Sequence, residues 1–250
     1  MHARAIDIVA ITLYIYPMKK PFLAALVLCF CVFPLAAQGY NNDPQDDRFF
    51  WFLSGSILFF PHNNNQNAGV LESGPMPILP SPGAGLSFSL VDIFRLELTM
   101  DIYRTLYAYS DNLGRPVPVE LENRSAQVIS PLIGLQGAAF FHLRPDITAR
   151  VFGGLAFDLR MVLLAPNLRE DYDPMDEIRR EVEAIRRYFW SSGRWLTPVL
   201  GVGADYTLNS QFRLGIDLRT WMPIYRLWTN ENLPAIEGWR FGAGLRLTIQ

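Results

Sequence analysis

Charged residues recur at alternate positions within several apolar segments, and they are the most chemically capable residues of this chain. Within residues 94–107, Arg95, Glu97 and Asp101 alternate with large apolar side chains. Successive side chains of a strand point to opposite faces, so such a segment gathers its charges on one face. The set that shares this pattern is Arg95, Glu97, Asp101, Arg150, Asp158, Arg160, Asp205, Arg213, Asp217, Arg219, Arg240 and Arg246.

Two kinds of chemistry suit this set if its strands close into a barrel. Opposite charges on neighbouring strands could form an ion-pair network that plugs and stabilises the interior. Alternatively, the same charges could line a narrow constriction that selects solutes. Both interpretations stay open, because interior charges must be either paired or hydrated.

Residue patterns for catalysis are absent from the sequence. The histidines are His2, His62 and His142, and no HExxH motif or metal-spaced cluster accompanies them. We therefore expect no enzyme activity, no cofactor and no metal site. The formal net charge of −2 lacks the basic excess of nucleic-acid binders, so no nucleic-acid partner is expected.

The strands that must position these charges are predicted from two-residue periodicity. In the C-terminal segment, Trp239, Phe241 and Leu245 share an apolar face, while Arg240 and Arg246 lie on the other. In a transmembrane barrel, each strand typically has an apolar face toward lipid and a polar face toward the lumen. Segments of this kind cover residues 49–60, 83–90, 94–107, 127–143, 147–163, 195–208, 212–224 and 239–250. The expected fold is all-β, an eight-stranded antiparallel transmembrane β-barrel.

Connections between these segments alternate in length. Short turns carry turn-forming residues at 91–92, 144–146 and 209–211, and the long connections are 62–82, 110–126, 165–194 and 227–237. Outer-membrane barrels have short periplasmic turns and long extracellular loops. We therefore expect a bacterial outer-membrane location with the long loops extracellular; a secreted β-sandwich or lipocalin-like barrel is the alternative.

One amphipathic helix is predicted in the third long loop. Asp173 and Pro174 form a cap and a first-turn residue. The apolar stripe that follows is Met175, Ile178, Val182, Ile185 and Phe189. The helix could be a lid packed over the barrel mouth or on its own loop, or its stripe could contact a membrane surface or a partner.

The N-terminal region is expected to be processed. Residues 18–37 have the basic start, apolar run and small-residue cleavage site of a signal peptide. Residues 1–17 are interpreted as a mis-assigned upstream extension, residues 38–48 as a periplasmic linker and residues 49–250 as the barrel. The only cysteines, Cys29 and Cys31, would leave with the signal peptide.

Two prolines interrupt predicted strands. Pro131 and Pro198 cannot donate ladder hydrogen bonds, and their strands flank the same neighbour. They mark either a harmless bulge or a lateral opening in the wall.

The run from Gly201 to Arg219 and the closing Gly242–Leu247 resemble strands of small outer-membrane barrels, which include the OmpW-like, OmpA-like and opacity-protein-like families. Those proteins usually finish on an aromatic residue, whereas this chain finishes on Gln250. An OmpW-like relationship implies a narrow porin for small, hydrophobic solutes. The alternative is a surface-exposed structural or adhesive barrel whose loops bind host or matrix ligands. Outer-membrane lipid and the barrel-assembly machinery are the other expected partners.

Overall fold

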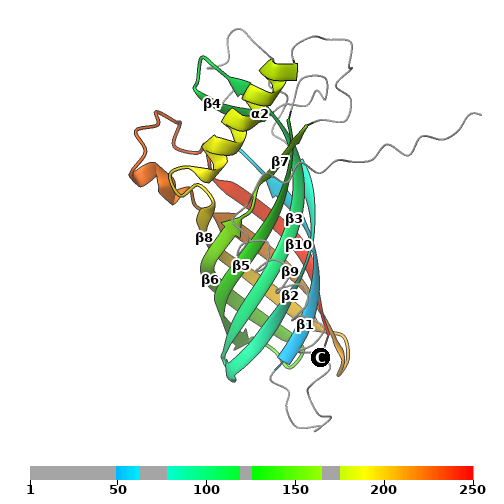
Figure 1. The fold of residues 1–250 in the computed structure, drawn as a ribbon. Helices are drawn as coiled ribbons and strands as arrows, with labels where there is room; N and C mark the ends of the chain where they lie inside the picture. Colours follow the sequence, from blue (N-terminus) through cyan, green and yellow to red (C-terminus); the bar gives the residue numbers. More distant parts are fainter. Residues whose placement is uncertain (1–48, 62–77, 119–125, 165–174, 250) are drawn as a thin grey trace, which may run out of the picture. The chain divides into compact units, whose positions relative to one another are not determined.

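The computed structural model describes residues 49–61, 78–118, 126–164 and 175–249 (Figure 1). The expected upstream extension (1–17), signal peptide (18–37) and linker (38–48) lie outside the described residues.

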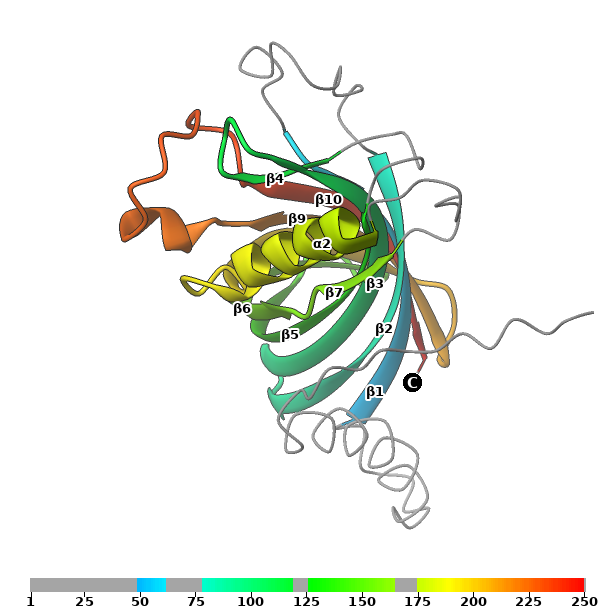
Figure 2. The same cartoon turned by 45° about the horizontal axis from the view of Figure 1, so that its top comes forward.

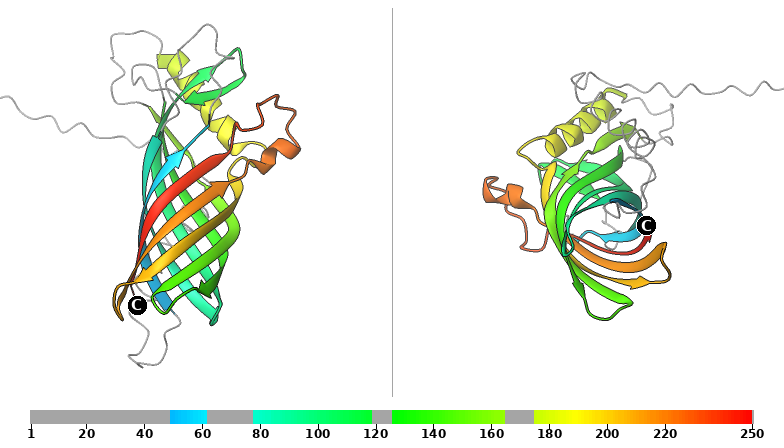
Figure 3. Two further views of the ribbon diagram at one scale, coloured as in Figure 1. Left: turned by 180° about the vertical axis from the view of Figure 1, so that it is seen from behind. Right: turned by 90° about the horizontal axis from the view of Figure 1, so that it is seen from below.

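Strands form a closed antiparallel barrel, as predicted. Neighbours along the chain pair with one another, and β1 pairs with β10 to close the ring (Figure 3). The barrel strands are β1 (Phe49–Phe59), β2 (Ile78–Val91), β3 (Phe94–Ser110), β5 (Ala126–His142), β6 (Ile147–Asp158), β8 (Leu196–Thr207), β9 (Phe212–Trp221) and β10 (Arg240–Ile249).

The polarity of the barrel is inverted relative to a water-soluble protein. Outward-facing Leu53, Ile216 and Leu245 have 55%, 59% and 59% of their surface exposed. Inward-facing Glu97 and Arg150 are 0% and 1% exposed. An apolar exterior around a charged interior is stable only where lipid surrounds the wall. The chain is therefore a transmembrane β-barrel rather than a secreted soluble one.

Two short strands extend one side of the barrel beyond its rim. β4 (Arg115–Pro118) pairs with the end of β3, and β7 (Met161–Leu164) pairs with the start of β5. We call these two strands, together with the adjoining ends of β3 and β5, the flap. The helix α2 (Met175–Trp190) packs against the flap (Figure 2). No helix in the described part of the chain is long and apolar enough to cross a membrane.

The apolar stripe of α2 is used inside the molecule. Ile185 and Phe189 are buried against Tyr107 and Val128, and Val182 packs beside them. Because the stripe packs against the flap in this hydrophobic cluster, the structure supports the lid interpretation. The side chains of Met175 and Ile178, the other members of the predicted stripe, lie outside the described residues.

Some predicted boundaries are wrong for physical reasons. β2 begins at Ile78 rather than Gly83, and its added part contains Pro80 and Pro82. β2 pairs with β1 from Ile78 to Phe88 but with β3 only from Gly83 to Val91, so these prolines cost no bond on the β3 side.

The predicted strand 147–163 is broken in the structure. β6 ends at Asp158, Leu159 is buried, and pairing resumes in β7. At the end of β9, Trp221 points into the lumen and is 2% exposed. Its indole therefore packs in the interior of the barrel, in a cluster with Leu132 and Val199.

Glycines let the small lumen accommodate long charged side chains. A Cβ on Gly203 would lie 2.5 Å from Asp217 Oδ1 and 2.8 Å from Arg150 Nε, whereas a Cβ on outward-facing Gly55 would meet nothing within 4 Å. The interior at Gly203 thus has no room for one methyl group.

Replacement of these glycines tests the packing. We expect Gly203→Ala to lower the free energy of unfolding by about 1–3 kcal/mol through overpacking. The matched change Gly55→Ala should be neutral or slightly stabilising, because the unfolded chain loses freedom. Urea unfolding in lipid vesicles measures both, and equal effects would contradict the packed interior.

Candidate functional site

The lower lumen, toward the short turns, holds a connected network of ion pairs. Glu97 accepts two hydrogen bonds from Arg246, at 2.7 and 3.0 Å, and lies 3.5 Å from Arg150. Arg150 also pairs with Asp217 and lies 3.5 Å from Asp205. Each carboxylate therefore faces at least one guanidinium, which offsets the cost of burying both.

The network continues upward through Arg219. This side chain binds Asp217 at 3.1 Å and Asp101 at 2.9 Å, and Ser54 donates to Asp101 at 3.2 Å. The residues come from β1, β3, β6, β8, β9 and β10. Arg150 and Asp205 lie on the neighbouring strands β6 and β8, as the predicted pairing expects, whereas other pairs reach across the lumen, such as Arg246 on β10 with Glu97 on β3. An eight-stranded barrel is narrow enough for arginine to reach across.

Aromatic rings pack against the arginines of this network. The guanidinium of Arg246 lies 3.6 Å from the ring centroid of Phe52. Nearer the short turns, Arg95 is sandwiched between Phe50 and Phe140, at 4.5 and 4.3 Å. These cation–π contacts fill space that water would otherwise occupy.

An apolar layer lies above the lower network. Its members are Leu58, Tyr103, Leu132, Ala156, Val199 and Trp221, which form one buried cluster. A cavity of about 10 Å³ separates this layer from Asp101 and Arg219. One water needs about 10–15 Å³, so this space holds one at most.

A smaller ion-pair group forms the ceiling of the lumen. Asp158 binds Arg240 at 2.6 Å and Arg160 at 2.8 Å, and it accepts a hydrogen bond from the Tyr103 hydroxyl at 2.9 Å. Arg240 also donates to Thr197 at 3.3 Å. Two guanidinium groups share one carboxylate, which leaves a local positive excess.

Of the twelve charged residues predicted to face the lumen, nine are buried. Arg95, Arg160 and Arg213 are half-buried. The predicted prolines lie in a hydrogen-bonded wall: the carbonyl of Pro131 accepts from Leu159 at 2.9 Å and that of Pro198 from Met222 at 2.9 Å. A lateral opening there stays a prediction, and it would require these bonds to break.

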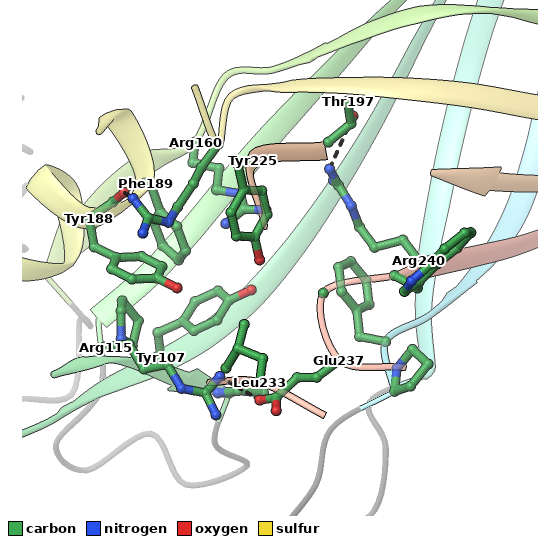
Figure 4. Close-up of a pocket in the computed structure, with 17 residues that line it drawn as sticks. Tyr107, Arg115, Arg160, Tyr188, Phe189, Thr197, Tyr225, Leu233, Glu237 and Arg240 are labelled. Atoms are coloured by element: carbon green, nitrogen blue, oxygen red, sulfur yellow. Dashed lines mark hydrogen bonds and ion pairs between the residues drawn. The ribbon is translucent and has the colours of Figure 1, made fainter. Parts of the chain in front are cut away.

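Above the ceiling lies a pocket of about 90 Å³, which we call the vestibule. Its floor includes Arg160, Thr197 and Arg240, and its walls come from the flap, α2 and the connection between β9 and β10. Figure 4 shows the hydroxyls of Tyr107, Tyr188 and Tyr225 directed toward the same space.

The vestibule is rich in guanidinium groups. Four arginines line it, namely Arg115, Arg160, Arg194 and Arg240. Arg115 pairs with Glu237 and Arg194 with Glu231, while the other two share Asp158. Among the described residues, four positive groups thus face three carboxylates. Burial raises the pKa of Tyr188, so its hydroxyl stays a donor at neutral pH.

Sequence reasoning missed most of the vestibule. Arg115, Arg194 and Glu237 lie in predicted long loops, and Tyr225 follows the end of a predicted strand, where periodicity carries no information about position. Among the described residues, no group of three or more histidine, cysteine or acidic side chains could hold a metal ion.

Neither a family model nor a curated protein matches this chain. Among solved structures it is similar to Neisserial surface protein A, with 11% identity, a TM-score of 0.46, and coverage of 80% of this chain and 96% of that one. The outer membrane protein OprG of Pseudomonas aeruginosa matches at 10% identity and a TM-score of 0.43, over 81% and 93%. Ail, the attachment invasion locus protein of Yersinia pestis, matches at 5% and 0.42, over 81% and 96%.

These relatives are small eight-stranded barrels of bacterial outer membranes. For this chain, the fold is established by its own strand pairing and inverted polarity. The chain is an eight-stranded transmembrane β-barrel.

Glu97 tests the contribution of the buried network. We expect Glu97→Gln to lower the free energy of unfolding by about 3–5 kcal/mol, because two guanidinium groups lose their charged partner. The control is Glu183→Gln on the surface of α2, where the ion pair with Arg186 should contribute less than about 1 kcal/mol. Urea unfolding in lipid vesicles compares the two, and similar midpoints would contradict a stabilising network.

Proposed function

We propose that this chain is a closed outer-membrane barrel whose vestibule binds an anionic group of an external ligand. This is the second of the two functions that the sequence left open. One observation carries the proposal: the lumen is filled with side chains apart from a cavity of about 10 Å³, while a pocket of about 90 Å³ lies at the long-loop end.

A filled lumen argues against conduction. A solute would meet two layers of ion pairs and, between them, the apolar layer around Leu132 and Trp221. Passage would require several buried pairs to separate at once. Breaking a single buried pair costs about 3–5 kcal/mol, so a porin of this geometry would need a large rearrangement.

The ligand class follows from the vestibule lining. The positive excess favours a carboxylate or phosphate group, and the hydroxyls of Tyr107 and Tyr225 can donate hydrogen bonds to it. Phe60, Phe189 and Leu233 supply apolar walls for the adjoining part of the ligand. A volume of about 90 Å³ suits an end group rather than a whole saccharide.

The orientation belongs to the same proposal. We place the short turns in the periplasm and the long connections outside the cell, as in other barrels of this kind. The vestibule then faces the medium, where a host or matrix ligand could reach it.

Conductance separates the two functions. In planar lipid bilayers we expect the purified protein to give no single-channel events, because the lumen layers stay closed. Refolding is verified by circular dichroism of the same sample. Reproducible conductance steps in folded protein would contradict the proposal and favour the narrow porin.

Binding is tested with glucuronate as a probe and glucose as its uncharged match. We expect Tyr225→Phe to weaken glucuronate binding by about 1.5–3 kcal/mol, roughly tenfold or more in Kd, through loss of a hydrogen bond to a charged group. The control is Tyr206→Phe, on the outer wall, where 49% of the side chain is exposed. Titration calorimetry that finds equal affinity for both sugars, or an equal effect of both variants, would contradict an anion site at the vestibule.

A further inference from the structure

The connection between β9 and β10 exposes large apolar side chains at its tip. Leu227 is 84% exposed, Trp228 55% and Ile236 53%. A loop tip in water is normally polar, so this exposure needs a reason. We call these three residues the apolar tip.

The charged side chains near the tip are bonded within the molecule, and the exposed polar side chains of the connection are Asn230 and Asn232. The guanidinium of Arg226 donates to the carbonyls of Leu233, Ala235 and Glu237 at 2.9, 3.0 and 3.3 Å. Between residues 224 and 236 the only other charged side chain is Glu231, which is bonded to Tyr188 and Arg194. Because these backbone carbonyls are hydrogen-bonded inside the loop, transfer of the loop into an apolar phase costs less free energy.

The tip is continuous with the lipid-facing wall. The indole of Trp228 donates to the carbonyl of Ser192 at 2.9 Å, just before the start of β8. Three residues further along, Trp195 stacks on the outward-facing Phe157 with ring centroids 5.9 Å apart. Figures 1 and 3 show the loop, with the 3₁₀ helix η3 (Ile224–Leu227), projecting sideways beyond the barrel wall rather than over its mouth.

We propose that the apolar tip inserts into the lipid leaflet on the long-loop side. Leucine, isoleucine and tryptophan suit the boundary between headgroups and acyl chains, because tryptophan prefers the membrane interface and aliphatic side chains prefer the acyl region. The tip and the vestibule share one loop, since Leu233 lines the vestibule and Glu231 holds Arg194 and Tyr188. Seating the tip in lipid therefore fixes one wall of the vestibule.

Fluorescence quenching of Trp228 tests this proposal on the full-length chain in lipid nanodiscs. Subtraction of the Trp228→Phe spectrum from the unsubstituted one isolates the contribution of this residue. We expect that contribution to be quenched by lipids brominated near the headgroup and shielded from aqueous iodide.

A second pair of variants guards against a local effect of Trp228→Phe. Leu227→Asp should withdraw the tip from lipid, shift the Trp228 emission to the red and admit iodide. Asn230→Asp, in the same loop, should leave the emission unchanged. Quenching by iodide but not by brominated lipid would overturn the proposal. Trp228 that is shielded from both quenchers, to an extent that depends on protein concentration, would also overturn it, because this result indicates a protein partner instead of lipid.

Discussion

The structure depends on the mutual neutralisation of charges that cannot reach bulk water. Lipid surrounds the wall, so charged side chains at the level of the acyl chains must face inward. Inside, a guanidinium such as that of Arg150 is stabilised only if carboxylates meet it. Closure of the barrel supplies these carboxylates, because it brings Asp217, Glu97 and Asp205 from three other strands to the level of Arg150.

This constraint divides the molecule into parts with different roles. The lumen is filled by alternating layers of ion pairs and apolar side chains, which suits rigidity rather than transport. Beyond the rim, the flap and α2 form a second apolar cluster around Ile185 and Phe189. That cluster holds the vestibule walls formed by the flap and α2 in place without help from lipid. The guanidinium-rich pocket that we propose as a binding site therefore lies where the chain leaves the membrane.

Much of the barrel was predictable because membrane strands obey a simple rule of alternation. The outward face of β3 and that of β10 follow the sequence pattern residue by residue. The inward charges were also recognisable. Their partners were not, since pairing across the lumen depends on closure and on stagger between distant strands.

Other features depend on contacts that a periodic pattern does not contain. β4 is four residues long and exists because the end of β3 offers it an edge. Trp221 turns inward because the apolar layer between the ion pairs has space for it. The vestibule is formed by loops that tertiary packing orders, so composition alone could not locate it.

The most direct test of a filled, ion-paired lumen is hydrogen exchange of arginine side chains by NMR in nanodiscs. The account predicts that the guanidinium protons of Arg150 and Arg246 exchange far more slowly than those of exposed Arg180 on α2. Equally fast exchange at all three would show that water fills the lumen, and it would contradict the central claim.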